Sequence, residues 1–111
     1  MGYMENVMGI PTLNVENEND VAGYTLIDVR REEEFCGELG HIEGATLKTL
    51  GDSLEDYLES ANKAQKILFI CRSGGRSAQA TQMALQMGFE GAYNMAGGML
   101  YWNSQNFKVH K

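Results

Sequence analysis

One of the two cysteines, Cys71, lies where an apolar run meets a short loop of small and basic residues. The run is Ile67–Ile70, and the loop reads Cys71-Arg72-Ser73-Gly74-Gly75-Arg76-Ser77. The amphipathic stretch over residues 77–87 predicts a helix that ends at Gly88. A strand, a loop and a helix N-terminus in this order gather unpaired backbone N–H groups around residue 71. Because the thiolate form of cysteine is a nucleophile, the segment predicts sulfur chemistry on an anionic substrate.

The small residues of the loop suit it to surround an anion. Gly74 and Gly75 permit the positive φ values of a tight ring and leave no side chain between backbone and ligand. Ser73 and Ser77 either add hydroxyl donors or cap the start of the helix. These four residues are therefore candidates for binding the substrate.

The loop also contains two arginines, and they complete the candidate site. The planar guanidinium of Arg76 can turn toward an oxyanion, whereas Arg72 is expected at the pocket mouth. Lowering a thiol pKa from about 8.5 to roughly 6.5 raises its thiolate fraction at pH 7 from about 3% to about 75%. The accompanying loss of nucleophilicity, roughly eightfold, leaves a gain of only about threefold. The main role of the ring is therefore to hold an anionic donor and to stabilise the charged product on the cysteine.

Strand and helix patterns alternate along the chain, which favours an α/β domain with a mainly parallel sheet. Expected strands cover residues 12–15, 25–29, 66–70 and 92–95, and expected helical segments cover 32–35, 53–62, 77–87 and a last turn after Gly97-Gly98. Ligands of such sheets bind at the carboxyl ends of the strands. Cys71 follows one such end and Asp28 lies near another.

The length of 111 residues allows one hydrophobic core, and we expect a loose tail over residues 1–10 and a single domain over residues 11–111. A net charge of −6 disfavours nucleic acid and anionic membranes as partners. No apolar run reaches the roughly 18 residues of a membrane span, and the N-terminus lacks the pattern of a signal peptide. Two cysteines are too few for a disulfide framework, so we expect a cytoplasmic protein.

Several landmarks occur in the order typical of a known family. They are Leu26-Ile27-Asp28-Val29-Arg30, Glu34-Phe35, Gly40-His41-Ile42-Glu43-Gly44-Ala45, the loop from Cys71 to Ser77, and Asn94-Met95-Ala96-Gly97-Gly98 with Trp102. In this set the chain resembles the rhodanese family of sulfurtransferases in its single-domain form. The resemblance implies a five-stranded, mainly parallel sheet with helices on both faces.

The resemblance also implies a mechanism and a set of site residues. Cys71 would take sulfane sulfur from thiosulfate or a similar anionic donor, become a persulfide, and pass the sulfur to cyanide or a thiol. Backbone N–H groups from Arg72 to Ser77 would hold the sulfur, and Arg72 and Arg76 would favour anionic donors. No cofactor is implied, and no cluster in the sequence has the spacing of metal ligands. The loop from Cys71 to Arg76 has six residues, as in the sulfurtransferases, whereas related phosphatases have one more.

Two features depart from the family pattern. Four residues, 36–39, lie between Phe35 and Gly40 where about two are usual, and residues 14–23 are too polar and short for the usual first helix. Two other functions stay open: a carrier module in a relay of protein persulfides, and a phosphatase-like or arsenate-reducing enzyme. The short loop and the absence of an evident general acid beside Cys71 disfavour the last.

Some other reactive side chains have a structural interpretation that we favour over a catalytic one. Cys36 is either a resolving thiol for Cys71 or a surface or packing residue, and nothing in the sequence brings the two cysteines together. Asp28 is expected in an ion pair at the strand end, and His41 in a structural turn.

Three further side chains have expected places. Arg30 and Glu34 are expected to form a local ion pair on the surface. His110, near the end of the chain, is expected to be free of side-chain partners.

Overall fold

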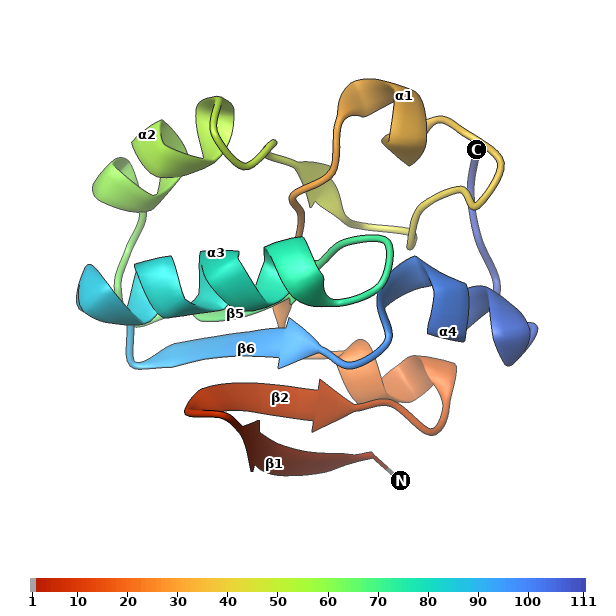
Figure 1. Cartoon of the computed structure of the whole chain (residues 1–111), viewed down its shortest axis with the longest axis horizontal. Helices are drawn as coiled ribbons and strands as arrows, with labels where there is room; N and C mark the ends of the chain where they lie inside the picture. Colours follow the sequence, from red (N-terminus) through yellow and green to blue (C-terminus); the bar gives the residue numbers. More distant parts are fainter. Residues whose placement is uncertain (1) are drawn as a thin grey trace.

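The structure, a computed structural model, describes residues 2–111 and contains a six-stranded sheet with helices on both faces (Figure 1). The strand order is β1-β2-β6-β5-β3-β4, and β1 is antiparallel to β2 while all other neighbours are parallel. The strands are β1 (Tyr3–Val7), β2 (Ile10–Asn14), β3 (Thr25–Asp28), β4 (Thr46–Leu47), β5 (Lys66–Ile70) and β6 (Gly91–Met95). The helices are α1 (Glu32–Phe35), α2 (Ser53–Ser60), α3 (Gly75–Gln86) and α4 (Gly98–Ser104), with a 3-10 turn η1 (Glu18–Val21). The α/β class and the mainly parallel sheet are thus confirmed.

The central strand β5 divides the core into two clusters because its side chains alternate between the faces of the sheet. Ile67 and Phe69 face the cluster that α2 and α3 cover, and this cluster includes Cys71. Leu68 and Ile70 face the opposite cluster, to which α4 and η1 contribute. All four apolar residues are fully buried, as expected for a parallel strand covered on both sides.

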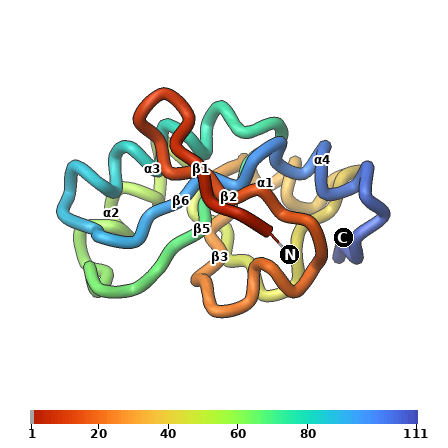
Figure 2. The backbone as a smooth tube through the Cα atoms, turned by 90° about the horizontal axis from the view of Figure 1, so that it is seen from below, coloured from red at the N-terminus to blue at the C-terminus, as the bar shows by residue number. Residues whose placement is uncertain are grey.

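The N-terminal residues differ from the expected loose tail. Residues 3–7 form β1, which pairs with β2 through a turn at Met8 and Gly9, both with positive φ (Figure 2). Such a two-residue turn matches the twist of a hairpin. Every residue of β1 is exposed, so the strand carries no burial pattern that would reveal it in the sequence. Residue 1 of the predicted tail lies outside the described residues, and the hairpin makes the sheet six-stranded instead of five-stranded.

The site-bearing edge of the sheet is formed where β3, β5 and β6 end. There the loop after β5 lies between α1 and α4, as Figure 1 shows to the right of the sheet. The helix α3 begins at Gly75, two residues earlier than the sequence predicts, because Gly74 adopts a left-handed conformation with φ 109° and serves as its N-cap. Within residues 2–111, no helix has the length and apolar character needed to span a membrane.

Candidate active site

The side chain of Cys71 is buried, and its sulfur accepts hydrogen bonds from the loop that follows it. The backbone N–H of Gly74 donates to Sγ at 3.0 Å, and the hydroxyl of Ser77 lies 3.2 Å from the same atom. Only 1% of Cys71 is exposed. Two groups that the sequence analysis expects at the sulfur, the Gly74 N–H and Ser77, therefore lie there, and Ser77 uses its side chain to contact the sulfur while Gly74 is the N-cap of the helix.

The electrostatics of this cradle favour the thiolate. Burial raises the pKa of the Cys71 thiol, and the Ser77 hydroxyl and the backbone N–H groups of Ser77, Gly74 and Ser73 lower it. The hydrogen bonds prevail, so the pKa lies below its ordinary value. Ser73 itself is exposed and contributes through its backbone.

The start of α4 fixes the backbone of the cysteine loop. The N–H of Met99 donates to the carbonyl of Cys71 and that of Leu100 donates to the carbonyl of Arg72, both at 2.9 Å. Gly98 makes this approach possible, because a Cβ there would lie 2.5 Å from the Cys71 carbonyl oxygen. The Gly97-Gly98 pair thus lets a helix from the far end of the chain hold the reactive loop.

Arg76 is engaged by a carboxylate. Its two terminal nitrogens donate to the two carboxylate oxygens of Glu34 in α1, at 2.7 and 2.8 Å. The Arg76 hydrogen bond holds the pKa of Glu34 at about 2, well below its usual range. The guanidinium therefore ties the loop to α1 in this structure, and its binding of a donor anion stays a prediction.

The end of β3 carries a buried ion pair. Asp28 accepts hydrogen bonds from Nε and Nη2 of Arg30 at 2.9 and 2.8 Å, and both side chains are at most 1% exposed. Arg30 also donates to the carbonyl oxygens of Glu34 and Gly40. The expected ion pair of Asp28 is confirmed, whereas the expected surface pair of Arg30 with Glu34 is wrong. The reason is that Asp28 and two carbonyls satisfy the buried guanidinium, while Glu34 turns its carboxylate to Arg76.

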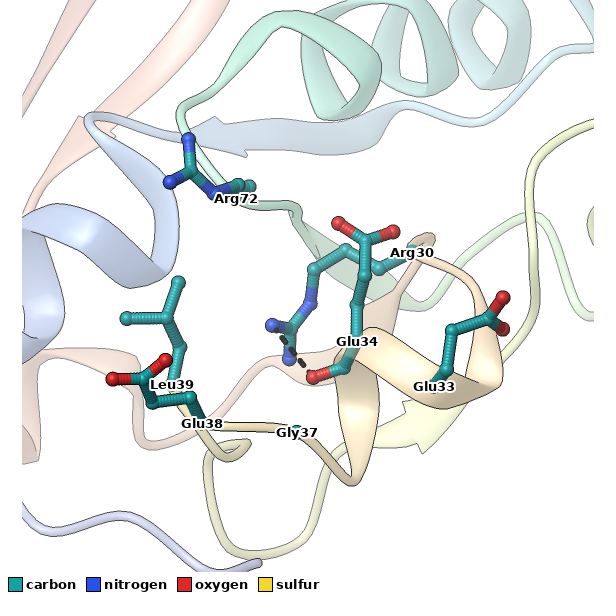
Figure 3. Close-up of a pocket in the computed structure, with 7 residues that line it drawn as sticks. All are labelled: Arg30, Glu33, Glu34, Gly37, Glu38, Leu39 and Arg72. Atoms are coloured by element: carbon teal, nitrogen blue, oxygen red, sulfur yellow. Dashed lines mark hydrogen bonds between the residues drawn. The ribbon is translucent and has the colours of Figure 1, made fainter.

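A pocket of about 360 Å3 opens beside the cysteine loop (Figure 3). Its lining comprises Arg30, Glu33, Glu34, Gly37, Glu38, Leu39 and Arg72. Figure 3 shows Arg72 on the loop after β5, on the side of the pocket opposite Leu39 and Glu38. Arg72 is exposed, in agreement with its expected place at the pocket mouth. Residues 37–39 of the extended connector therefore lie along one side of this pocket.

The other side chains weighed in the sequence, Cys36, His41 and His110, lie outside the surroundings of the Cys71 sulfur. Cys36 is exposed and follows α1, and the ring of His41 stacks on Phe35 with its Nδ1 2.9 Å from that residue's carbonyl oxygen. His110, expected to be free, instead pairs its backbone with His41 and lies 3.2 Å from a Glu43 carboxylate oxygen. Across residues 2–111, no group of three or more His, Cys, Asp or Glu side chains is arranged to hold a metal ion.

Sequence reasoning missed a role for Asn94. This residue of β6 is 8% exposed, accepts from the Ser77 hydroxyl through Oδ1, and donates through Nδ2 to the Gly74 carbonyl at 3.2 Å. It therefore contacts two members of the cradle. Its place at the end of a strand next to β5 was the available signal, since neighbouring parallel strands end at one edge.

Comparisons with known proteins agree with this geometry. The family model described as "Rhodanese-like domain" matches residues 13–105. "Thiosulfate sulfurtransferase 18" of Arabidopsis thaliana is 30% identical over 102 residues, which cover 80% of this chain and 74% of that protein. "Putative sulfur carrier protein YrkF" of Bacillus subtilis (strain 168) is 30% identical over 105 residues, which cover 91% of this chain and 55% of that protein.

A solved structure supports the same assignment. The crystal structure of a rhodanese-like domain protein from Staphylococcus aureus is similar with a TM-score of 0.65 and 31% identity, over 79% of this chain and 82% of that one. The match of fold, family model and relatives confirms the resemblance drawn from the motifs. The chain belongs to the rhodanese-like domain family.

Proposed function

We propose that this protein is a sulfurtransferase that carries sulfane sulfur as a persulfide on Cys71. The observation that carries the proposal is the position of Cys71 Sγ, which receives the Gly74 N–H and lies beside the Ser77 hydroxyl at the start of α3. These donors favour negative charge on the sulfur before it attacks and when it leaves. The sulfurtransferase name of the Arabidopsis relative supports the same class of reaction.

The reaction we propose is a pair of displacements at sulfur. The Cys71 thiolate attacks the sulfane sulfur of the donor, and a new S–S bond forms while the bond to the donor's leaving group breaks. With thiosulfate, sulfite leaves with the electron pair and Cys71 becomes a persulfide anion. An acceptor thiolate or cyanide then attacks the outer sulfur, and Cys71 leaves as the thiolate. The cycle needs no external oxidant, because each step moves a neutral sulfur atom.

The mass of the intact protein tests this proposal. Incubation with thiosulfate under non-reducing conditions should add one sulfur atom, and cyanide should remove it and release thiocyanate. Cys71→Ser should abolish the gain, while Cys36→Ser, the matched change at the exposed cysteine, should retain it. A wild-type mass that neither thiosulfate nor a small-molecule persulfide changes would contradict the persulfide proposal.

The pocket gives a specific reason to consider a second candidate, a sulfur carrier that exchanges with a protein persulfide. Two charged residues of the pocket lining are already neutralised, Arg30 by Asp28 and Glu34 by Arg76. The other charges in the lining are those of Arg72, Glu33 and Glu38. Thiosulfate carries two negative charges, which Arg72 attracts and the two glutamates repel. A partner protein that places basic side chains beside its own thiol fits this mixed surface better than a small dianion. The name of the Bacillus subtilis relative, a putative sulfur carrier protein, is consistent with this candidate.

The two candidates differ in the donor that loads Cys71 efficiently. Thiosulfate turnover that saturates and falls with Cys71→Ser would support the enzyme acting on the small anion. Efficient loading by a persulfidated cysteine desulfurase, with negligible turnover of thiosulfate, would support the carrier. Comparing both donors on the same preparation separates the two functions.

A further inference from the structure

The Ser77 hydroxyl faces two acceptors with a single proton. Its oxygen lies 3.2 Å from Cys71 Sγ and 2.5 Å from Asn94 Oδ1. A hydroxyl donates one hydrogen bond at a time and accepts others through its lone pairs. Since all three side chains are buried, water does not supply the missing donor freely. The Ser77 hydroxyl can therefore donate either to the Cys71 sulfur or to the Asn94 amide oxygen, but not to both at once.

The amide of Asn94 is held in one orientation by the loop. Its other end faces the carbonyl oxygen of Gly74 at 3.2 Å, and a carbonyl accepts but cannot donate. Nδ2 must therefore point to Gly74, which leaves Oδ1 facing Ser77. Turning the amide over would bring two oxygens together at Gly74, so Asn94 acts as a fixed acceptor toward the Ser77 hydroxyl.

The two protonation states of Cys71 use this arrangement differently. As a thiol, Cys71 can donate its proton to the Ser77 oxygen while Ser77 donates to Asn94, so that all three groups are paired. When Cys71 ionises and its proton passes to water, Ser77 turns its own proton to the sulfur. The oxygen of Asn94 then faces a Ser77 lone pair at 2.5 Å. Ionisation therefore sacrifices the hydrogen bond between Ser77 and Asn94.

We propose that Asn94 is a positioning residue that competes with Cys71 for the Ser77 proton and so makes the thiolate less favourable than the Ser77 hydroxyl alone would make it. The thiolate then forms when Ser77 gives up its bond to Asn94. A thiol is less readily alkylated or oxidised than a thiolate, so this competition also limits unwanted modification of Cys71 between turnovers. Asn94 of β6 thus opposes ionisation of Cys71, whereas the N–H and hydroxyl donors at the sulfur favour it.

The charged groups near Cys71, Ser77 and Asn94 stay the same when Ser77 or Asn94 is replaced by an uncharged residue. Arg76 of α3 interacts electrostatically with both Cys71 and Asp28 of β3, and it is itself paired with Glu34 of α1. Asp28 is neutralised by Arg30. β6 and α4 contain no Asp, Glu, His, Lys or Arg residue, and no acidic side chain of α2 is buried. The tyrosines of β6 and α4 have other partners: Tyr93 packs edge-on against Tyr24, and Tyr101 donates to the Val15 carbonyl. Changes at Ser77 and Asn94 leave these charges in place.

The test measures the pH at which Cys71 is half ionised, from the thiolate absorbance and from the rate of iodoacetamide alkylation. The full chain carries Cys36→Ser so that only Cys71 reports, and no sulfur donor is added. The result therefore holds or fails independently of the proposed function. Asn94→Leu, which removes the acceptor but keeps the branching, should lower the midpoint by about one pH unit. Asn94→Asp, which keeps an acceptor and adds a negative charge, should raise it by at least about as much.

Opposite shifts separate this role from a merely structural one. A loosened loop would move the midpoint in the same direction for both substitutions, and that result would overturn the proposal. In a Ser77→Ala background, Asn94→Leu should no longer shift the midpoint, and a shift that persists there would also overturn it. Thr12→Val is the matched control, because Thr12 is buried and pairs with Asn94 in the sheet while its hydroxyl donates to the Ile10 carbonyl. A midpoint that Thr12→Val lowers as far as Asn94→Leu would likewise count against the proposal.

Discussion

The cradle around Cys71 and the wall of the pocket beside it are built from opposite kinds of groups. The cradle uses backbone N–H groups and the buried hydroxyl of Ser77, and among residues 2–111 no charged group donates a hydrogen bond to the sulfur. The wall presents the exposed charges of Glu33, Glu38 and Arg72. Fixed dipoles in a buried site need no reorganisation during the reaction, whereas exposed charges are screened by water and salt. The cradle should therefore set reactivity, and the wall should adjust which donor is preferred.

The largest expected effect comes from disturbing the backbone that carries the cradle. In Gly98→Ala the new methyl group would lie 2.5 Å from the Cys71 carbonyl oxygen and 2.6 Å from the Arg72 carbonyl, at a residue with φ 56°. The start of α4 must then move away from the loop. We expect a loss of about 3 kcal/mol in the free energy of unfolding. We also expect persulfide formation to slow by on the order of a hundredfold, because small misplacements of reacting groups cost that much.

Gly51→Ala is the matched control for this prediction. Gly51 also has a positive φ, 84°, but a Cβ there meets no atom within 4 Å. It should cost about 1 kcal/mol in urea unfolding from backbone strain alone and leave the rate of persulfide formation unchanged. Equal slowing by both alanine variants would mean that the contact between α4 and the loop does not position Cys71.

The site also contains some features that could be predicted from the sequence and others that could not. The Cys71 loop was predictable because its strand, glycines and helix are contiguous, and local geometry follows from local residues. The pairing of Arg76 with Glu34 spans 42 residues and depends on how the chain folds over the edge of the sheet. The contact of Asn94 in β6 with Ser77 in α3 spans 17 residues and depends on the fold in the same way. Hence the local arrangement of strand, loop and helix at Cys71 was predicted, whereas the distant partners of Arg76 and Ser77 were not.

The strand β1 shows a different reason for failure. All of its residues are exposed, so its sequence has neither an apolar face nor a burial period to indicate a strand. Its turn places Met8 at φ 53°, a conformation that a residue with a side chain rarely adopts. A hairpin of this kind is held by backbone pairing with β2, which the sequence pattern does not report.

An intermediate effect on the free energy of unfolding is expected from the ion pair between Arg76 and Glu34, which joins the cysteine loop to α1. Glu34→Gln removes the carboxylate that accepts both Arg76 nitrogens and should lower the free energy of unfolding by about 1–2 kcal/mol near pH 7, allowing for solvent screening. The folded pKa of Glu34 is about 2 against an ordinary 4.5. The stabilisation is therefore fully present above about pH 4.5 and is lost as the pH falls toward 2. Urea unfolding at a series of pH values should show the wild type and Glu34→Gln converging in acid.

Glu43→Gln provides the control for an exposed carboxylate. Glu43 is 71% exposed and lies 4.0 Å from Lys108 and 3.2 Å from His110. Its substitution should change the free energy of unfolding by less than about 0.5 kcal/mol. If the difference between Glu34→Gln and wild type stayed constant down to about pH 2, the charge of Glu34 would not be the source of the stabilisation.

The smallest effects should come from the pocket wall, and they sharpen the division between reactivity and donor choice. Neutralising Glu33 and Glu38 together by Gln should lower the KM for thiosulfate, and Arg72→Ala should raise it, each by about two- to fivefold. Both changes should shrink as salt is added, because exposed charges are screened within about 10 Å at 0.1 M ionic strength. The rate of alkylation of Cys71 by the neutral reagent iodoacetamide should stay the same in both variants, since neither alters the donors to its sulfur. A change in that rate as large as the change in KM would mean that the wall charges tune the nucleophile itself, and the division between cradle and wall would fail.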